Sequence, residues 1–322
     1  MNAKIKNSML AGMKYSGVFV YARYRSRSLL RILAYHGVEH IDGILNCDGF
    51  QVDPETFSRQ LDHIATSYRV VSLSEAIAGT EKPFWPKNSL LITFDDGYLN
   101  NLEVAAPILR QKGLPAVFFI TTGFIDQTIP PWWYVLRGWI AGVGAKALGL
   151  PPLSIHLSSM SDATRLWEWE TYLKSLTQQE RSMKLMEISR SLGLSITSEI
   201  KMMNWNQVRE LRDNGFDIGP HTVSHINLGA EDSGDIVREI STSMEKLERE
   251  LGFCPSTYSY PYGRVSDIQP DVLSTLRSRN IRLGLTTVSG MNKPGSNSLL
   301  YKRLNITGNH KGLAFEKMLA MG

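Results

Sequence analysis

Two neighbouring aspartates, Asp95 and Asp96, come directly after the apolar run 89–94. This run is rich in strand-forming residues, and α/β folds bind their ligands at the carboxyl ends of strands. Successive side chains on an extended backbone diverge, so adjacent carboxylates can serve one site in two different roles. The alternative is an ordinary strand that ends in an Asp-Gly turn.

Two histidines, His221 and His225, follow another predicted strand, 216–220. Both imidazoles can reach one ion, and one aspartate would complete three protein ligands with open positions for water and substrate. Such a set is typical of a catalytic metal site. Two surface histidines in a loop are the alternative, but the presence of both pairs at strand ends favours the metal site.

A third strand, predicted over 28–35, ends in His36. Taken by itself, His36 is as well explained by a structural histidine at a strand end. A fourth predicted strand end is the segment Tyr260-Pro261-Tyr262-Gly263.

The segments between these strand ends alternate between strand and helix patterns, which predicts parallel pairing with right-handed crossovers. Asp53 and Pro54 have the types of an N-cap and a first helical residue, and Asn204 is a second N-cap. Helices are predicted from Asp53 and from Asn204, and over 100–112, 164–194, 238–251 and 271–279. Further strands are predicted over 68–73, 115–121, 283–287 and 301–306.

Residues from about 124 to 200 break this alternation and read as a helical insertion. No flexible linker flanks it, so we expect a single domain over 28–322 that carries the insertion, not a separate domain. Its aromatic start includes Trp132 and Trp133, either of which can stack on a sugar ring. Core packing of an inserted helix is the alternative.

The composition is that of a folded globular protein, with 43% hydrophobic and 20% charged residues. The net charge of +4 comes without a basic block, so we expect no nucleic-acid partner. Two distant cysteines form no disulfide framework, which favours a reducing compartment. Residues 1–27 form a basic amphipathic segment, too interrupted for a membrane span or a signal peptide. It is expected to pack on the domain or to touch a membrane surface.

Three of these stretches resemble the leading motifs of the polysaccharide deacetylases with a NodB-type domain, carbohydrate esterase family 4. They are Thr93-Phe94-Asp95-Asp96-Gly97, His221-Thr222-Val223-Ser224-His225 and Tyr260-Pro261-Tyr262-Gly263. Their order fits as well, and the resemblance covers about residues 30–307. It implies an α/β fold, a distorted (β/α) barrel of about seven strands.

The resemblance also implies roles for these residues. Asp96, His221 and His225 would bind one divalent metal ion, zinc in the usual case, with Co, Ni, Fe or Mn as alternatives. Asp95 would be the general base, and the backbone N–H of Tyr262 would hold the oxyanion.

Two features depart from the common pattern of the family. In the family, the general acid is ordinarily a histidine in a motif near the C-terminus, and His310 lacks the setting of that motif. The stretch Leu33-Ala34-Tyr35-His36-Gly37 matches the motif instead. This order resembles the circularly permuted branch of the family, which includes the poly-N-acetylglucosamine deacetylases. This resemblance assigns the acid to His36. Ser259 stands where the family has an arginine that orients the base, and Arg303 is a candidate substitute, with a surface or strand-pairing arginine as the alternative.

The resemblance therefore implies a metal-dependent hydrolase that removes N-acetyl groups from an amino sugar in a polysaccharide or glycan precursor. A sugar deformylase, an O-acetyl esterase and a non-catalytic carbohydrate-binding protein are the alternatives. We expect a cytoplasmic or membrane-peripheral location.

Overall fold

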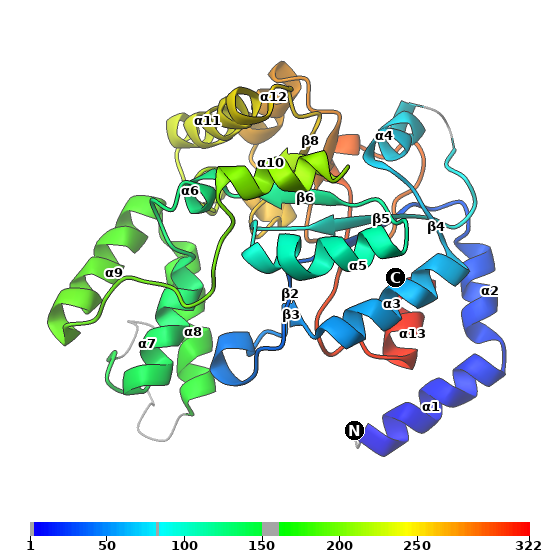
Figure 1. Cartoon of the computed structure of the whole chain (residues 1–322), viewed down its shortest axis with the longest axis horizontal. Coiled ribbons are helices and arrows are strands. Elements are labelled where there is room, and N and C mark those ends of the chain that lie inside the picture. Colours follow the sequence, from blue (N-terminus) through cyan, green and yellow to red (C-terminus); the bar gives the residue numbers. More distant parts are fainter. Residues whose placement is uncertain (1–2, 82–83, 150–160) are drawn as a thin grey trace.

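The computed structural model describes residues 3–81, 84–149 and 161–322 (Figure 1). Parts of the predicted N-terminal segment, at 1–2, and of the predicted insertion, at 150–160, lie outside these ranges. Within them the fold is mixed α/β with parallel strands, which confirms the predicted fold class.

The main sheet is parallel throughout and has the strand order β10-β1-β5-β6-β7, with β4 also pairing with β5. Its strands are β1 (Arg31–Tyr35), β4 (Arg69–Val70), β5 (Ser89–Phe94), β6 (Val117–Ile120), β7 (Asp217–Pro220) and β10 (Leu304–Asn305). Two short parallel pairs accompany it: β2 (Gly37–Val38) with β3 (Gln51–Val52), and β8 (Thr257–Ser259) with β9 (Leu283–Leu285).

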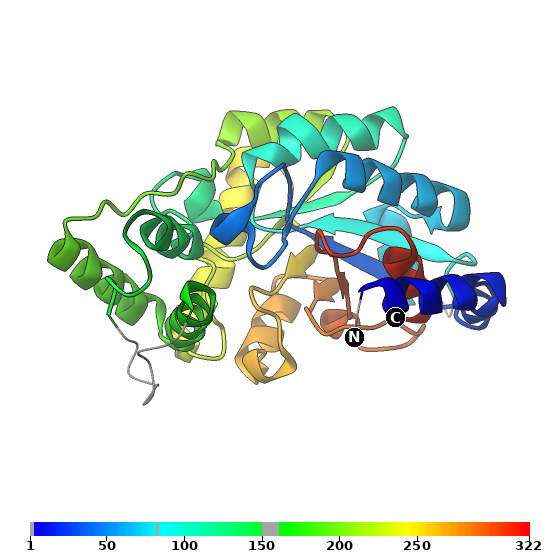
Figure 2. The same ribbon diagram turned by 90° about the horizontal axis from the view of Figure 1, so that it is seen from below.

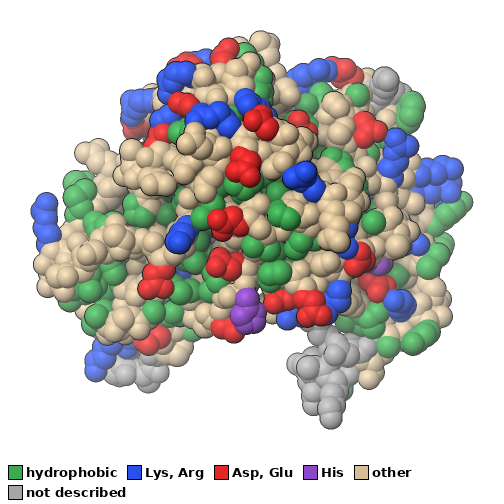
Figure 3. All heavy atoms as spheres, viewed as in Figure 1, with side chains coloured by type: hydrophobic (Ala, Val, Ile, Leu, Met, Phe, Trp, Pro, Cys, Tyr) green, Lys and Arg blue, Asp and Glu red, His purple; other side chains and the backbone are tan. Residues whose placement is uncertain are grey.

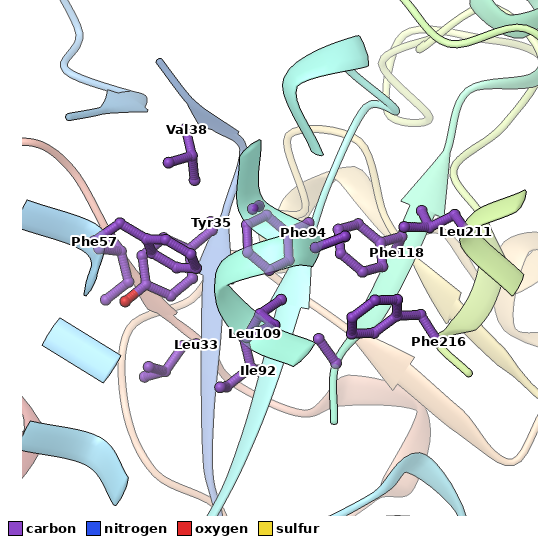
Figure 4. Packing of buried hydrophobic residues seen from close by; sticks show 14 of the residues in the cluster. Leu33, Tyr35, Val38, Phe57, Ile92, Phe94, Leu109, Phe118, Leu211 and Phe216 are labelled. Atoms are coloured by element: carbon purple, nitrogen blue, oxygen red, sulfur yellow. The ribbon is translucent and has the colours of Figure 1, made fainter. Parts of the chain in front are cut away.

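Both faces of the main sheet are buried, because alternate residues of each strand enter different cores. On β5, Ile92 and Phe94 pack into the larger core, whereas Leu91 enters the core on the opposite face. The larger core contains a row of aromatic rings: Phe94 stacks on Tyr35 and on Phe118, with ring centroids 5.3 and 4.7 Å apart (Figure 4). The opposite core also contains Leu283 and Leu285 of β9, so the smaller pair covers that face.

The ladders of the main sheet and of the two short pairs do not form a complete ring among the described residues. A bridge between Leu285 and Tyr301 connects the β8–β9 pair to the segment before β10. Between β7 and β8 no ladder is present in the described ranges, although Nδ1 of His221 and the carbonyl oxygen of Ser259 lie 2.8 Å apart there. The parallel sheet is therefore established, and the closed barrel stays a prediction.

Helices α3, α5 and α10 form one layer over the sheet, and the β8–β9 pair lies on its other side (Figure 2). The side chain of Asp53 accepts a hydrogen bond from the Thr56 amide, which confirms the predicted cap of α3. The predicted helix 100–112 begins instead with a π-helical turn, Asn101–Ala105. The helices around the sheet are α3 (Pro54–Ser67), α4 (Leu73–Glu81), α5 (Ala106–Gln111), α10 (Trp205–Asp213), α11 (Ser233–Leu251) and α12 (Pro270–Ser278).

The insertion projects from one end of the molecule (Figures 1 and 2). It contains α6 (Thr122–Ile125), α7 (Trp132–Val143), α8 (Asp162–Ser175) and α9 (Gln178–Leu192). The stretch predicted to be helical over 164–194 consists of two helices: α8 ends at Ser175, and Thr177 caps α9 in a reciprocal pair with Glu180. A largely aromatic core of its own holds these helices together.

The N-terminal segment forms two helices, α1 (Ala3–Tyr15) and α2 (Val18–Arg25), at the opposite end of the long axis (Figure 1). Their inner side chains Leu10 and Phe19 pack with Ala320 of α13 (Leu313–Met321), a helix that the sequence reasoning missed. Lys14 also pairs with Glu316 at 2.8 Å. The segment therefore packs on the domain, one of its two expected positions.

Candidate active site

The polar strand ends meet at one edge of the sheet, around a cavity of about 690 Å³. This follows from the parallel pairing, since Tyr35 of β1 lies beside Phe94 of β5 and the residues after both strands reach the same edge. Its lining includes the predicted residues His36, Asp95, Asp96, His221, His225 and Tyr262. It also includes Asp48, Phe50, Tyr98, Trp133, Tyr134, Arg137, Trp167, Glu170, Thr171, Lys174, Ser175, Asn227, Tyr260, Arg264, Asp267, Thr287 and Asn305.

Asp96, His221 and His225 form a buried cluster whose ligand atoms all lie within 4.8 Å of one another. Oδ1 of Asp96 is 3.3 Å from Nε2 of His225 and 3.6 Å from Nε2 of His221. Two imidazole nitrogens and one carboxylate oxygen suit zinc and related divalent ions, and three protein ligands leave coordination positions open.

The hydrogen bonds around this cluster leave its inner atoms for an ion. The hydroxyl of Tyr98 donates to Oδ2 of Asp96 at 2.8 Å, while the buried Oδ1 has no hydrogen-bond partner among the described residues. Nδ1 of His221 lies 2.8 Å from the carbonyl oxygen of Ser259, so the ring carries its proton on Nδ1 and turns an Nε2 lone pair toward Asp96. The residues present therefore fit a divalent metal ion.

The charge states of the cluster also suit metal binding. Burial lowers the pKa of His221 to about 4, so the ring is a neutral ligand at pH 7. Burial alone would raise the pKa of Asp96, but the neighbouring histidines, His225 above all, hold that pKa well below its ordinary value.

Three residues at this site have a strained backbone conformation. Asp96, His225 and Tyr262 have φ angles of +79°, +50° and +57°, in the left-handed region that side chains with a Cβ disfavour. Such conformations persist only where surrounding contacts determine them.

Contacts from α6 and α11 hold the loop that carries the two histidines. The Glu239 carboxylate accepts from the amides of Val223 and Ser224, at 2.8 and 2.9 Å. The amide of Gly123 donates to the Val223 carbonyl at 2.8 Å. A Cβ on Gly123 would lie 2.5 Å from that oxygen, so this close approach requires glycine.

Asp95 has a different set of partners from its neighbour. Arg303 donates to both of its oxygens, Nη1 to Oδ1 at 2.8 Å and Nη2 to Oδ2 at 2.7 Å, and the Ser259 hydroxyl donates at 3.2 Å. Burial would raise the pKa of Asp95, but the Arg303 guanidinium above all, together with His221 and His36, holds that pKa below its ordinary value.

Arg303 lies beside Asp95, where the candidate substitute was expected. It is fully buried and is not among the residues that line the cavity, so it contacts Asp95 and not the substrate. The alternative of a surface arginine is wrong, because Arg303 is fully buried. The guanidinium and the hydroxyl of Ser259 together hold both oxygens of Asp95.

His36 lines the same cavity as Asp95, whereas His310 does not. The ring of His36 stacks on Phe50, with centroids 4.2 Å apart, and its buried Nδ1 has no partner among the described residues. Nδ1 of His310 accepts instead from the Thr307 amide at 3.0 Å.

Trp132 is not placed as expected. It is buried, with 4% of its surface exposed, lies outside the cavity lining, and donates through Nε1 to the Tyr262 hydroxyl at 3.1 Å. Trp132 is therefore a core residue of the insertion. Trp133 reaches the cavity instead, 4.7 Å from the ring of His225, because successive helical side chains point about 100° apart.

Tyr262 lines the cavity on the other side of His225, with ring centroids 4.8 Å apart. Its amide donates to no acceptor among the described residues, which leaves this N–H available to a ligand.

Several residues of the cavity were missed by sequence reasoning. Tyr98 lies two positions after Asp96, and its place next to the acidic pair was the available signal. For Trp167 and Lys174 no local signal existed, since only packing brings α8 to the reaction centre.

Three comparisons with known proteins bear on this site. A family model described as polysaccharide deacetylase matches residues 85–283. The chain is 22% identical over 308 residues to the poly-beta-1,6-N-acetyl-D-glucosamine N-deacetylase of Staphylococcus aureus, with 92% of this chain and 83% of the relative covered.

Two solved structures are similar in fold. They are the deacetylase PplD of Streptococcus pyogenes in complex with acetate and IcaB from Ammonifex degensii, with TM-scores of 0.62 and 0.59 and 18% identity each. The matches cover 90% and 92% of this chain and 98% of each structure. The family match spans more than half of the chain and includes the aspartate pair, both histidines and Tyr262. The chain therefore belongs to the polysaccharide deacetylase family.

Proposed function

We propose that this protein is a metal-dependent hydrolase that removes N-acetyl groups from an amino sugar in a polysaccharide. The observation that carries the proposal is the buried Asp96-His221-His225 cluster beside the Asp95–Arg303 pair in one cavity. Membership of the polysaccharide deacetylase family supports the reaction, hydrolysis of the carbon–nitrogen bond of an acetamido group. The name of the relative supports an N-acetylglucosamine polymer as the substrate.

Asp96, His221 and His225 would hold one divalent ion, and we propose zinc because two imidazoles and a carboxylate are a common zinc set. Cobalt, nickel, iron or manganese would be accepted by the same donors. When bound, the ion polarises the acetyl carbonyl and lowers the pKa of water.

The chain's own residues then move protons and stabilise charge. Asp95 accepts the proton of the attacking water, because Arg303 holds it ionised and oriented toward the cavity. The amide of Tyr262 donates to the former carbonyl oxygen, which becomes an oxyanion when water adds to the carbonyl carbon. His36 gives a proton to the departing amine, which otherwise leaves slowly.

This division of roles is tested by two isosteric substitutions. Asp95→Asn should lower kcat for acetate release from N-acetylglucosamine oligomers at least about 100-fold while the metal content is retained. Asp96→Asn should lose metal as well as activity, because it removes the carboxylate ligand. Elemental analysis of both purified variants, with acetate quantified in parallel, gives the readout.

Metal loss in Asp95→Asn but not in Asp96→Asn would mean that the two roles are exchanged. Oligomer binding without acetate release by the wild type would favour a non-catalytic sugar-binding protein. Faster release from O-acetyl than from N-acetyl sugars would favour an esterase, and release from N-formyl sugars a deformylase.

We also propose that α1 and α2 place the protein on an anionic membrane surface. Residues 1–30 contain six lysines and arginines and no aspartate or glutamate. Their outward side chains include Ile5, Met9, Tyr15, Val20, Tyr21 and Tyr24, all of them exposed. Apolar side chains flanked by cations are the pattern of helices that lie in a membrane interface. Among the described residues no helix is long and apolar enough to span a bilayer.

A further inference from the structure

Helix α8 has two different faces, and one of them forms a wall of the catalytic cavity. Leu166, Trp169 and Leu173 repeat at helical spacing and are buried in the core of the insertion. Trp167, Thr171 and Lys174 repeat in the same way on the adjoining face, and these three line the cavity.

Trp167 is unusual among the tryptophans on this wall and next to it. It is 66% exposed, whereas Trp133 and Trp169 are 9% and 1% exposed. A large apolar side chain contributes little to stability when it is left in water, so the fold gives no reason for an indole here. An exposed aromatic ring in the lining of a cavity is instead typical of a ligand contact.

The wall that carries Trp167 is held rigidly. Arg137 of α7 donates from Nε to Glu170 at 2.9 Å and from Nη2 to Asp48 at 2.5 Å, and all three side chains are largely removed from solvent. These bonds connect α8 to α7 and to the segment after β2. A ring on such a support is already in place before a ligand arrives, which lowers the entropy cost of binding.

The polar groups beside Trp167 suit a sugar. Thr171, Ser175 and Asn227 are among the lining residues. The two hydroxyls donate to carbonyl oxygens of α8, and the Asn227 amide donates to the Lys174 carbonyl oxygen, so the hydroxyl oxygens are still able to accept from a ligand. Lys174, on the same face of α8, places Nζ 5.9 Å from the ring centroid of Tyr262. An aromatic face with hydroxyl and amide groups around it matches a pyranose, which has apolar C–H faces and a polar rim.

We propose that Trp167 forms a sugar-stacking subsite next to the reaction centre, which binds a second ring of the glycan chain while its neighbour is deacetylated. This inference rests on the proposed function and adds a requirement for chain length. Binding energy from a ring that does not react can be used to orient the one that does. The enzyme should therefore prefer an oligosaccharide to a single sugar or to a small acetyl compound.

The test compares Trp167→Ala with the wild type on two substrates. For a β-1,6-linked N-acetylglucosamine tetrasaccharide we expect kcat/KM to fall about tenfold, mainly through KM, because one aromatic contact is lost. For 4-nitrophenyl acetate, which has no second ring, we expect no change. Trp167→Phe should recover most of the activity on the tetrasaccharide.

Met183→Ala is the matched control, since Met183 is an exposed apolar residue of the insertion outside the cavity lining. It should leave both substrates unaffected. An equal loss on both substrates in Trp167→Ala, or no loss on either, would overturn the subsite.

A binding measurement separates this inference from the proposed function. Calorimetric titration of the tetrasaccharide into Asp95→Asn and into Asp95→Asn/Trp167→Ala needs no turnover. Weaker binding to the double variant supports the subsite even if the wild type releases no acetate. Equal binding to both variants contradicts the subsite even if the wild type is an active deacetylase.

Discussion

Asp95 and Asp96 are adjacent in sequence, yet their surroundings give them different chemistry. Arg303 and Ser259 engage both oxygens of Asp95, whereas Tyr98 engages one oxygen of Asp96 and leaves the other facing two histidines. A carboxylate held by a bidentate arginine is suited to accept a proton from a defined direction. A carboxylate with one free oxygen between two imidazoles is suited to bind a cation.

The proposed acid role of His36 gives a prediction at the same scale. His36→Ala should lower kcat for the tetrasaccharide by about 100-fold or more, because the amine would leave without a proton. Hydrolysis of 4-nitrophenyl acetate should fall much less, because nitrophenolate leaves without protonation. Steady-state kinetics on both substrates measures the difference.

His310→Ala is the control for this prediction, since His310 lies outside the cavity lining. It should retain nearly normal turnover of both substrates. Nearly normal turnover in His36→Ala together with loss in His310→Ala would contradict the assignment.

Residue types predicted the metal cluster well but could not predict the support around it. His221 and His225 carry a signal in their spacing, and a parallel sheet brings strand ends together whatever the details of packing. Arg303 lies 208 positions from Asp95, and Glu239 supports the histidine loop from another helix. Such pairs depend on the complete tertiary structure. The choice between Trp132 and Trp133 depended on the rotation of α7, which a local pattern does not fix.

At the scale of elements, the residues that cap helices were predicted more reliably than the positions at which helices begin and end. Asn204 caps α10 as expected, with Gln207 returning a hydrogen bond to its amide. The break between α8 and α9 was missed because the residues on both sides favour a helix. The π-helical turn after β5 was also missed, although it places the Asn101 side chain on the carbonyl oxygen of His36 at 2.7 Å.

Strand β7 supports a prediction of pH-dependent stability. It begins at Asp217 and ends at the histidine loop. Burial raises the pKa of Asp217, although a hydrogen bond from the Leu73 amide acts in the opposite direction. A carboxyl with a raised pKa in the folded state contributes stability below its unfolded pKa and loses it as the pH rises through the folded pKa. Asp217→Asn should therefore be more stable than the wild type at pH 7.

Urea unfolding at several pH values measures this effect. The gain in the urea midpoint of Asp217→Asn over the wild type should vanish below about pH 3, where the Asp217 carboxyl is protonated in both the folded and the unfolded state. Acetate release should not change, because Asp217 lies at the strand end away from the cavity. If Asp217→Asn is less stable than the wild type at pH 7, the hydrogen bond from the Leu73 amide requires the ionised carboxylate of Asp217.

At the scale of the whole molecule, the two additions to the sheet lie at opposite ends of the long axis (Figure 2). The insertion with α8 builds a wall of the cavity at one end, and α1 and α2 lie at the other. Contact of α1 and α2 with a membrane would therefore leave the cavity accessible to a long polymer. Neither position was predictable from the sequence, because the length of a segment does not tell which end of a sheet it covers.

The membrane proposal gives the last prediction. Hydrophobic side chains and cations share the edge formed by α1 and α2 (Figure 3). The protein should sediment with vesicles of phosphatidylcholine and 30% phosphatidylserine, but not with pure phosphatidylcholine, and salt should weaken the binding. Arg25→Glu should reduce binding at least about fivefold, since each cation near an anionic surface contributes about 1 kcal/mol.

Arg249→Glu is the control, because it changes an exposed arginine of α11, and it should leave vesicle binding unaffected. Equal binding to both kinds of vesicle, or equal effects of both substitutions, would contradict an electrostatic contact through α1 and α2.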